Sequence, residues 1–125
     1  MSEPSQLQAL FGRALERLPA AQANEAIARM RQREGSEGRR AISYEVVLPA
    51  ENPLEHLTET VLPRLVYFLD CSGAKLPRCA GVFLSLFFND ELFLIRAADA
   101  IDELSRLTGL SSAQMTARYG AQSQR

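Results

Sequence analysis

Few residues of this chain have the types and spacing that catalysis or metal binding requires. His56 is the only histidine, and it follows Glu55 in a stretch with helical periodicity rather than in an acid–base motif. A lone histidine is more often a surface or core residue than a general base. Cys71 and Cys79 match no common zinc-ligand spacing and are too few for a disulfide framework. We therefore expect no catalytic residue, no metal and no cofactor, and the chain is predicted not to be an enzyme.

Two pairs of carboxylates stand four residues apart, a spacing that places both on one face of a helix. Glu51 pairs in this way with Glu55, and Asp99 with Glu103. Such a pair can share a proton or bind a divalent cation, but it is more often part of a solvated helix face. The glycine-rich stretch at 35–38 lacks the lysine of a phosphate-binding loop. These features predict solvated surface rather than chemistry.

Arginines lie before and within a glycine-containing loop at 35–40. Residues 29–40 carry five arginines against two glutamates, a local net charge of +3. This composition predicts a solvated loop between elements or, alternatively, an arm that binds an anionic partner. No aromatic residue lies between the arginines, so base stacking is not supported. Arg39 and Arg40 are the candidate partner-binding residues of this loop.

Residues 101–119 have the pattern of a helix, a glycine turn and a second helix. Ser105 is a small residue at which two helices can approach closely, and Gly109 tolerates the positive φ of a tight turn. Ser111 is a good N-cap for the second helix. The apolar residues that would hold the two helices together are Leu104, Leu110 and Met115.

This segment resembles the helix-turn-helix of the MerR and LacI classes of bacterial regulator. In those families the second helix enters the major groove of DNA, where glutamine can read adenine and arginine can read guanine. The resemblance implies a DNA-binding transcriptional regulator, acting as a dimer. The same pattern also fits a simple packing corner between two helices, and the sequence leaves both interpretations open. The residues that the resemblance assigns to DNA binding are Ser112, Gln114, Thr116 and Arg118.

The N-terminal segment carries an apolar stripe at helical spacing that extends as far as Leu18. A second, alanine-rich helix is predicted over 20–33, so that 1–34 would form two amphipathic helices. The stripe can pack into the core of the same domain, or it can form a helical seam with another protein or a second copy of the chain. The candidate partner-binding residues of this seam are Leu7, Leu10, Phe11 and Leu15.

The central part of the chain gives one clear strand and one helix. Residues 41–48 alternate between apolar and polar side chains, which predicts a half-buried strand. Asn52 and Pro53 are suited to the N-cap and first position of a following helix. Pro63 is expected to kink that helix or to divide it after Val61.

The run Val82–Phe88 is too uniformly apolar for its periodicity to identify its structure. We favour a buried helix, with Asn89 as the cap of a further helix that continues to Thr108. The alternative is a strand that pairs with Leu92–Ile95 as a hairpin.

Length and composition favour one domain over 1–125: amphipathic helices at 1–34, the loop at 35–40, and a core at 41–125. The predicted fold class is mainly α, a single compact helical domain with one short strand or small hairpin. The alternative is an α+β domain with a small antiparallel sheet.

No signal-peptide pattern and no membrane-length apolar run is present, which predicts a cytoplasmic location away from membranes. The expected function is that of a non-enzymatic regulatory or adaptor protein of bacterial type, acting through protein–protein interaction. Its partner would be another protein or a second copy of the chain, as a homodimer. DNA is the partner under the helix-turn-helix alternative, although the net charge of −1 gives no general attraction to nucleic acid.

Overall fold

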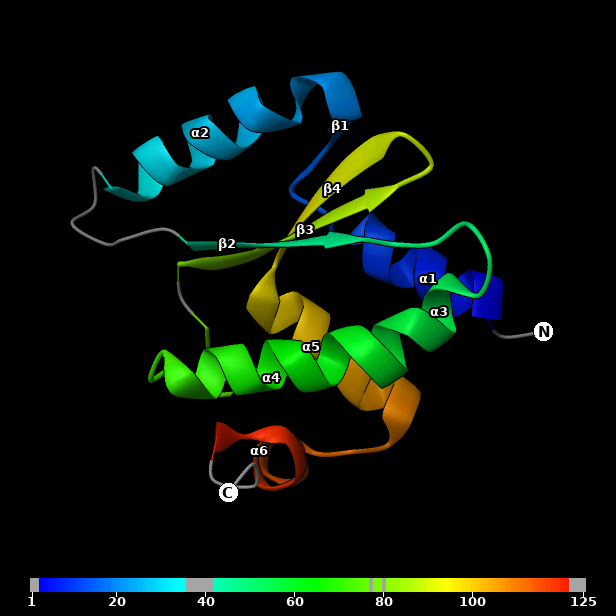
Figure 1. The fold of residues 1–125 in the computed structure, drawn as a ribbon, viewed down its shortest axis with the longest axis vertical. Helices are drawn as coiled ribbons and strands as arrows, with labels where there is room; N and C mark the ends of the chain where they lie inside the picture. The colour runs from blue at the N-terminus through cyan, green and yellow to red at the C-terminus, as the bar shows by residue number, and fades with distance from the viewer. Residues whose placement is uncertain (1–2, 36–41, 77, 80, 122–125) are drawn as a thin grey trace.

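The computed structural model describes residues 3–35, 42–76, 78–79 and 81–121, which form a mixed four-stranded sheet with helices on both faces (Figure 1). In chain order the elements are α1 (Glu3–Gly12), β1 (Glu16–Pro19), a short 3-10 turn η1 (Ala20–Gln22), α2 (Ala23–Gly35), β2 (Ile42–Val47), α3 (Pro53–His56), a π-helical segment η2 (Leu57–Val61), α4 (Leu62–Cys71), β3 (Val82–Phe88), β4 (Glu91–Arg96), α5 (Ala97–Thr108) and α6 (Ser112–Tyr119). The fold class is therefore α+β.

The prediction of a mainly helical domain with one short strand or small hairpin is wrong. The strands lie in the order β1-β4-β3-β2, with β1 and β3 antiparallel to β4 and β2 parallel to β3. The α+β alternative is closer, although the sheet is mixed rather than antiparallel. The strand predicted over 41–48 is confirmed as β2. The chain returns from β2 to β3 through α3, η2 and α4, because a parallel pair needs a long crossover.

The run Val82–Phe88 is strand β3, not the helix that we favoured, and the hairpin with β4 is confirmed. Its first five side chains are buried irrespective of which face of the sheet they occupy, so no alternation remains to indicate a strand. Asn89 does not cap a helix. Asn89 and Asp90 have φ values of 50° and 61°, as the two central residues of a tight hairpin turn require. The following helix, α5, begins only at Ala97.

The N-terminal stripe is divided between a helix and a strand. Helix α1 ends at Gly12, and Glu16–Pro19 pairs with β4 at one edge of the sheet. The side chain of Leu10 is fully buried in the core, and Phe11 stacks on Phe93 with a distance of 4.1 Å between ring centroids. Most of the stripe is therefore used to pack α1 onto the sheet.

Each face of the sheet has its own apolar core. Helix α2 covers one face, where Ala26, Ile27 and Met30 pack against residues of β3 and β4. The opposite face carries the larger core, built from α1, the α3–η2–α4 segment and α5. Helix α6 packs against α4 on the side away from the sheet (Figure 1).

Pro63 follows a change of helix type rather than a break in the helical segment that crosses beneath β2. A proline at this position has no N–H to donate to the preceding turn, and the π-helical segment η2 widens that turn while the backbone of Val61 and Leu62 stays helical. Asn52 is the N-cap residue of α3, with Pro53 in the first position, but its side chain makes no capping hydrogen bond.

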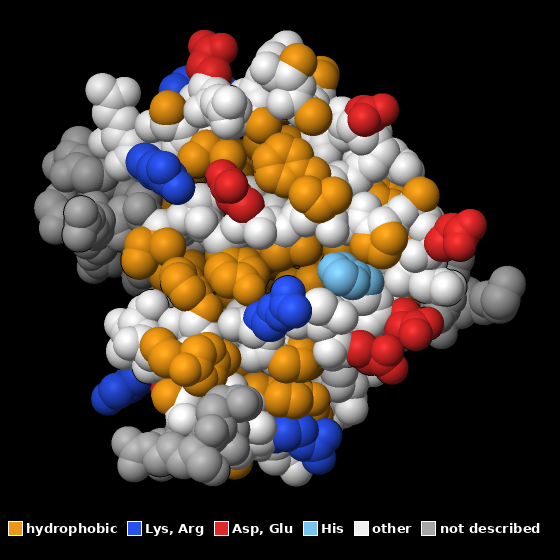
Figure 2. Space-filling view, viewed as in Figure 1, with side chains coloured by type: hydrophobic (Ala, Val, Ile, Leu, Met, Phe, Trp, Pro, Cys, Tyr) orange, Lys and Arg blue, Asp and Glu red, His pale blue; other side chains and the backbone are white. Residues whose placement is uncertain are grey.

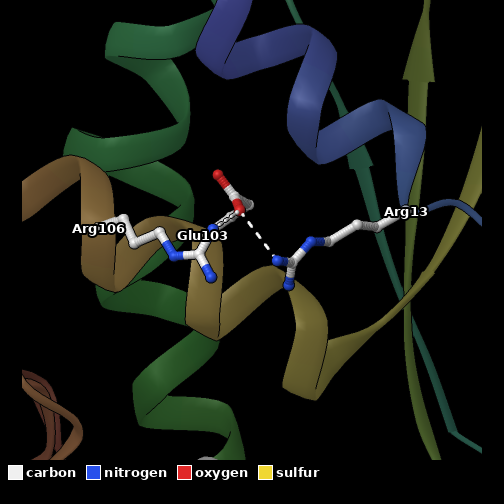
Figure 3. A network of polar contacts seen from close by, with 3 residues as sticks. All are labelled: Arg13, Glu103 and Arg106. Atoms are coloured by element: carbon white, nitrogen blue, oxygen red, sulfur yellow. Dashed lines mark hydrogen bonds and ion pairs between the residues drawn. The ribbon is translucent and has the colours of Figure 1, made fainter.

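A buried carboxylate joins α1 to α5. Only 6% of the Glu103 side chain is exposed, and its Oε1 lies 3.4 Å from the Arg13 guanidinium and 3.1 Å from that of Arg106 (Figure 3). Arg13 directly follows α1, whereas Arg106 lies one turn along α5. The spacing of Asp99 and Glu103 predicted a solvated acidic face, and for Glu103 this prediction is wrong. Glu103 instead forms ion pairs with both arginines and helps hold α1 against α5.

Candidate functional site

Strand β2 is the last strand at one edge of the described sheet. The Ile42 N–H donates to the Gly81 carbonyl at 2.8 Å, and the Leu48 N–H donates to the Phe87 carbonyl at 2.8 Å. In a parallel pair, every second residue of a strand directs its backbone N–H and C=O groups to that neighbour, so Ile42, Tyr44, Val46 and Leu48 face β3. The backbone N–H and C=O groups of Ser43, Glu45 and Val47 therefore point away from β3. Among the described residues, none pairs with this edge.

A groove runs between the β2 edge and the helical segment below it. Apolar side chains gather in a band across this face of the molecule, over β2 and α4 (Figure 2). The groove contains two hollows, of about 620 Å³ and 220 Å³, which share Tyr44 and Arg64. We call this surface the β2–α4 groove, and the residues that line it are Tyr44, Glu45, Val46, Val47, His56, Thr60, Val61, Pro63, Arg64, Tyr67, Phe68 and Cys71.

The larger hollow is walled mainly by aromatic side chains. The Tyr44 ring packs on the Phe68 ring with 5.2 Å between centroids. Tyr67 is 43% exposed, and its hydrogen bond to the Cys71 thiol raises the pKa of the tyrosine hydroxyl above its usual range. This end of the groove, which we call the aromatic hollow, can bury an apolar side chain.

The smaller hollow is polar. On the β2 side it is bordered by Glu45, Val46 and Val47, and the helical side contributes His56, Thr60 and Arg64. Arg64 is exposed and forms no ion pair with any residue that the structure describes. This end, which we call the polar hollow, can bind an anionic or hydrogen-bonding group.

This groove was not predicted from the sequence, in which His56 was interpreted only as an isolated histidine. A second signal was present, because Thr60, Arg64, Tyr67 and Cys71 recur at four- and three-residue spacing and so share one helix face. That β2 is an edge strand beside this face depends on strand order, which no local pattern encodes.

The two cysteines differ in their expected reactivity. Cys71 is exposed in the aromatic hollow, whereas burial, assisted by the Asp102 carboxylate, raises the pKa of Cys79 to about 11. Because the thiolate is the reacting form, iodoacetamide at pH 8 should alkylate Cys71 and spare Cys79 in the folded chain. Mass spectrometry after digestion measures both sites, with urea-unfolded protein as the control in which both react. Equal labelling in the folded chain would contradict this assignment.

The raised Cys79 pKa also has a consequence for stability. A thiol whose pKa is higher in the folded chain than in the unfolded chain stabilises the fold while it is protonated in both states. This contribution is complete below pH 9, near the ordinary value of 9.0, and is lost as the pH rises towards 11.

The predicted corner between α5 and α6 has the local geometry that its residues indicated. Gly109 ends α5 with φ 76°, and Ser111 caps α6 in a capping box with Gln114. The Ser105 hydroxyl donates to the Leu110 carbonyl at 2.6 Å and so fixes the turn. Met115 is fully buried. The corner is therefore a rigid connection that docks α6.

The residues assigned to DNA binding differ in their exposure and in the hydrogen bonds that they already form. Gln114, Thr116 and Arg118 are exposed, and Ser112 is half-buried. The Gln114 side chain accepts a hydrogen bond from the Ser111 N–H at 2.8 Å, and the Thr116 hydroxyl donates to the Ser112 carbonyl. Reading a base with Gln114 would require breaking its capping bond.

Three of the four candidate residues of the N-terminal seam pack into the larger core from α1. Leu7 and Phe11 are half-buried against that core, and Leu10 has no exposed surface. Leu15 is 37% exposed between α1 and β1. These four residues therefore do not form an exposed seam. Arg39 and Arg40 lie outside the described residues.

Within the described part of the chain, no cluster of three or more histidine, cysteine or acidic side chains is arranged to hold a metal ion. No helix formed by these residues has both the length and the apolar character needed to cross a membrane.

Comparison with known proteins gives no relative: no family model, no curated protein and no solved structure matches this chain.

Proposed function

We propose that this chain is a non-enzymatic adaptor or regulatory protein of the cytoplasm that binds an extended segment of another protein at the β2–α4 groove. The segment would add to the sheet as a further strand along β2 and place alternate side chains in the groove. This mode of recognition takes its affinity from backbone hydrogen bonds and its specificity from pockets for alternate side chains.

The observation that carries this proposal is the open outer edge of β2 beside an apolar groove. Unpaired strand edges are usually blunted by proline, lysine, bulges or a covering element. Here Val47 is 73% exposed at the end of the strand, and the described apolar core under α2 includes residues of β1, β3 and β4 but none of β2. The exposed aromatic Tyr67 stands beside this edge as a side chain that a partner could cover.

The substitution Val47→Pro tests strand addition directly. It removes an N–H that points away from β3 while leaving the Leu48 N–H bond to Phe87 intact. Peptides are first selected on the immobilised chain from a random displayed library. Val47→Pro should weaken their binding at least about tenfold, because a backbone hydrogen bond is lost and the ring obstructs the edge.

Val47→Ala is the matched control, since it trims the same side chain but keeps the N–H, and its affinity should stay within about threefold of the parent. Circular dichroism should show that both variants remain folded. Hydrogen exchange gives a second readout: bound peptide should protect the amides of Ser43, Glu45 and Val47. A library that yields no binder, or binders that ignore Val47→Pro, would show that β2 does not accept a strand.

DNA binding by α6 is the second candidate function, favoured by the exposed Arg118 and Thr116 on a capped helix at a glycine corner. It is the weaker candidate because Gln114 is engaged in the cap. Light scattering with random duplex DNA at low and high salt distinguishes the two. A salt-sensitive increase in mass that Arg118→Ala abolishes would favour DNA binding.

A further inference from the structure

The two hollows of the β2–α4 groove lie opposite successive groove-facing residues of β2. Tyr44 borders the aromatic hollow together with Tyr67 and Phe68, whereas Val46 borders only the polar hollow. A strand added to β2 would project alternate side chains toward the groove, one opposite Tyr44 and one opposite Val46. These two side chains would therefore meet different chemistry.

Arg64 favours an acidic side chain at the position of the bound segment that lies opposite Val46. Arg64 borders both hollows and has no ion-pair partner among the described residues, and His56 and Thr60 of the polar hollow can donate further hydrogen bonds. A carboxylate is the group that best matches a guanidinium in geometry and charge. The side chain opposite Val46 is thus expected to be acidic, and the one opposite Tyr44 apolar.

Glu45 favours a basic side chain at the position of the bound segment that lies between those opposite Val46 and Tyr44. It is exposed at the rim of the polar hollow, and by strand alternation it shares a face of β2 with Ser43, which contacts Ser85 through its hydroxyl, and with Val47. Opposite charges directly across two strands are stabilising, and like charges are destabilising. A basic side chain opposite Glu45 is therefore favoured.

The same residue disfavours a second copy of this chain as the occupant. Two β2 strands that pair antiparallel through the outward-facing groups of Ser43, Glu45 and Val47, with Ser43 opposite Val47, would place the Glu45 carboxylates of the two copies opposite each other. The occupant favoured by the charges is a segment of a different protein.

We infer that the bound segment runs antiparallel to β2 and reads acidic, basic and apolar at three consecutive positions, opposite Val46, Glu45 and Tyr44. The inference rests on the proposed strand addition and goes beyond it by stating which chemistry the segment carries. Antiparallel addition is chosen because antiparallel pairing is slightly more stable per residue than parallel pairing.

Two peptides of identical composition test the order of charges. One is Thr-Val-Glu-Lys-Leu-Val-Thr and the other is Thr-Val-Lys-Glu-Leu-Val-Thr, both acetylated and amidated. Isothermal titration with the full chain should show the first binding about five- to tenfold more tightly, since two exposed ion pairs are exchanged for two like-charge contacts.

A charge swap in the protein provides the decisive control. Arg64→Glu alone should remove the preference, and Arg64→Glu combined with Glu45→Arg should reverse it. Arg31→Glu, an equal charge change on the exposed surface of α2, should leave it unchanged. All of these positions are exposed, so the variants are expected to fold.

The outcomes separate this inference from the proposed function. Equal affinities for the two peptides, with both weakened by Val47→Pro, would overturn the charge order while strand addition stands. Failure of both peptides to bind, with hydrogen exchange at β2 unchanged, would overturn both. A chain that is dimeric in solution and becomes monomeric with Val47→Pro would overturn the inference in favour of a second copy.

Discussion

Phe93→Ala is expected to lower the free energy of unfolding by about 4 kcal/mol, the largest effect of any substitution considered for this chain. Phe93 is 2% exposed and connects three elements. Its ring stacks on Phe11 of α1, lies 5.1 Å below the Arg17 guanidinium of β1, and belongs to β4 itself. Truncation leaves a cavity and removes an aromatic pair worth about 1 kcal/mol beyond its buried area. Since small domains are stable by only about 5–15 kcal/mol, urea unfolding should show a large shift in midpoint.

Two control variants show whether the loss of stability in Phe93→Ala comes from the cavity left in the core rather than from removing any aromatic ring. Phe93→Leu keeps an apolar side chain but loses the stacking, and should cost about 1–2 kcal/mol. Tyr67→Ala removes an aromatic ring of similar size from the exposed wall of the groove, and should stay within about 0.5 kcal/mol of the parent. A Phe93→Ala midpoint close to that of Tyr67→Ala would mean that α1 is not packed on the sheet through this ring.

Glu103→Gln is expected to lower the free energy of unfolding by about 2–3 kcal/mol. The change keeps the shape of the side chain but removes the charge that the Arg13 and Arg106 guanidinium groups share. Removing one partner of a buried ion pair typically costs about 3–5 kcal/mol. The loss here should be somewhat smaller, because the arginine side chains are 33% and 68% exposed and can be solvated. Thermal unfolding at neutral pH measures it.

The two arginines are unequal partners, which supplies the control. Arg106 lies three residues from Glu103 on the same helix and its own side chain is 68% exposed, so Arg106→Ala should cost no more than about 0.5 kcal/mol. Arg13→Ala should cost more, because Arg13 connects the end of α1 to α5. A double-mutant cycle between Arg13 and Glu103 should give a coupling energy above about 0.5 kcal/mol. A coupling near zero would show that the carboxylate does not hold α1.

Local patterns predicted the elements whose structure depends on local chemistry. The alternation in β2, the change of helix type before Pro63, the Gly109 turn and the Ser111 cap all follow from side chains within a few residues of each other. The helix predicted for Val82–Phe88 was wrong because burial on both faces of a sheet erases the alternation that identifies a strand. The tight turn at Asn89 and Asp90 was the available local signal, but an asparagine also suits a helix N-cap.

The candidate site was less predictable than the fold. Strand β1 could not be recognised, because its residues continue the helical spacing of the preceding apolar stripe and become a strand only by pairing with β4. The β2–α4 groove requires β2 to be an edge strand and α4 to cross beside it. Both facts arise from strand order, which involves residues far apart in sequence. Tyr67 and Arg64 could be placed on a helix face from the sequence, but not beside an open strand edge.

The two edges of the sheet are not equivalent. At the far edge β1 is only four residues long and ends in Pro19, which has no N–H to offer an incoming strand. Under the proposed strand addition, the sheet would accept a partner strand at β2 but not at β1, and in the language of polymer chemistry the chain would be a monofunctional unit. Such a unit can terminate a growing stack of strands but cannot propagate it. Its complexes should therefore have a fixed stoichiometry, and the chain at excess should act as a chain stopper for partners that polymerise through strand pairing.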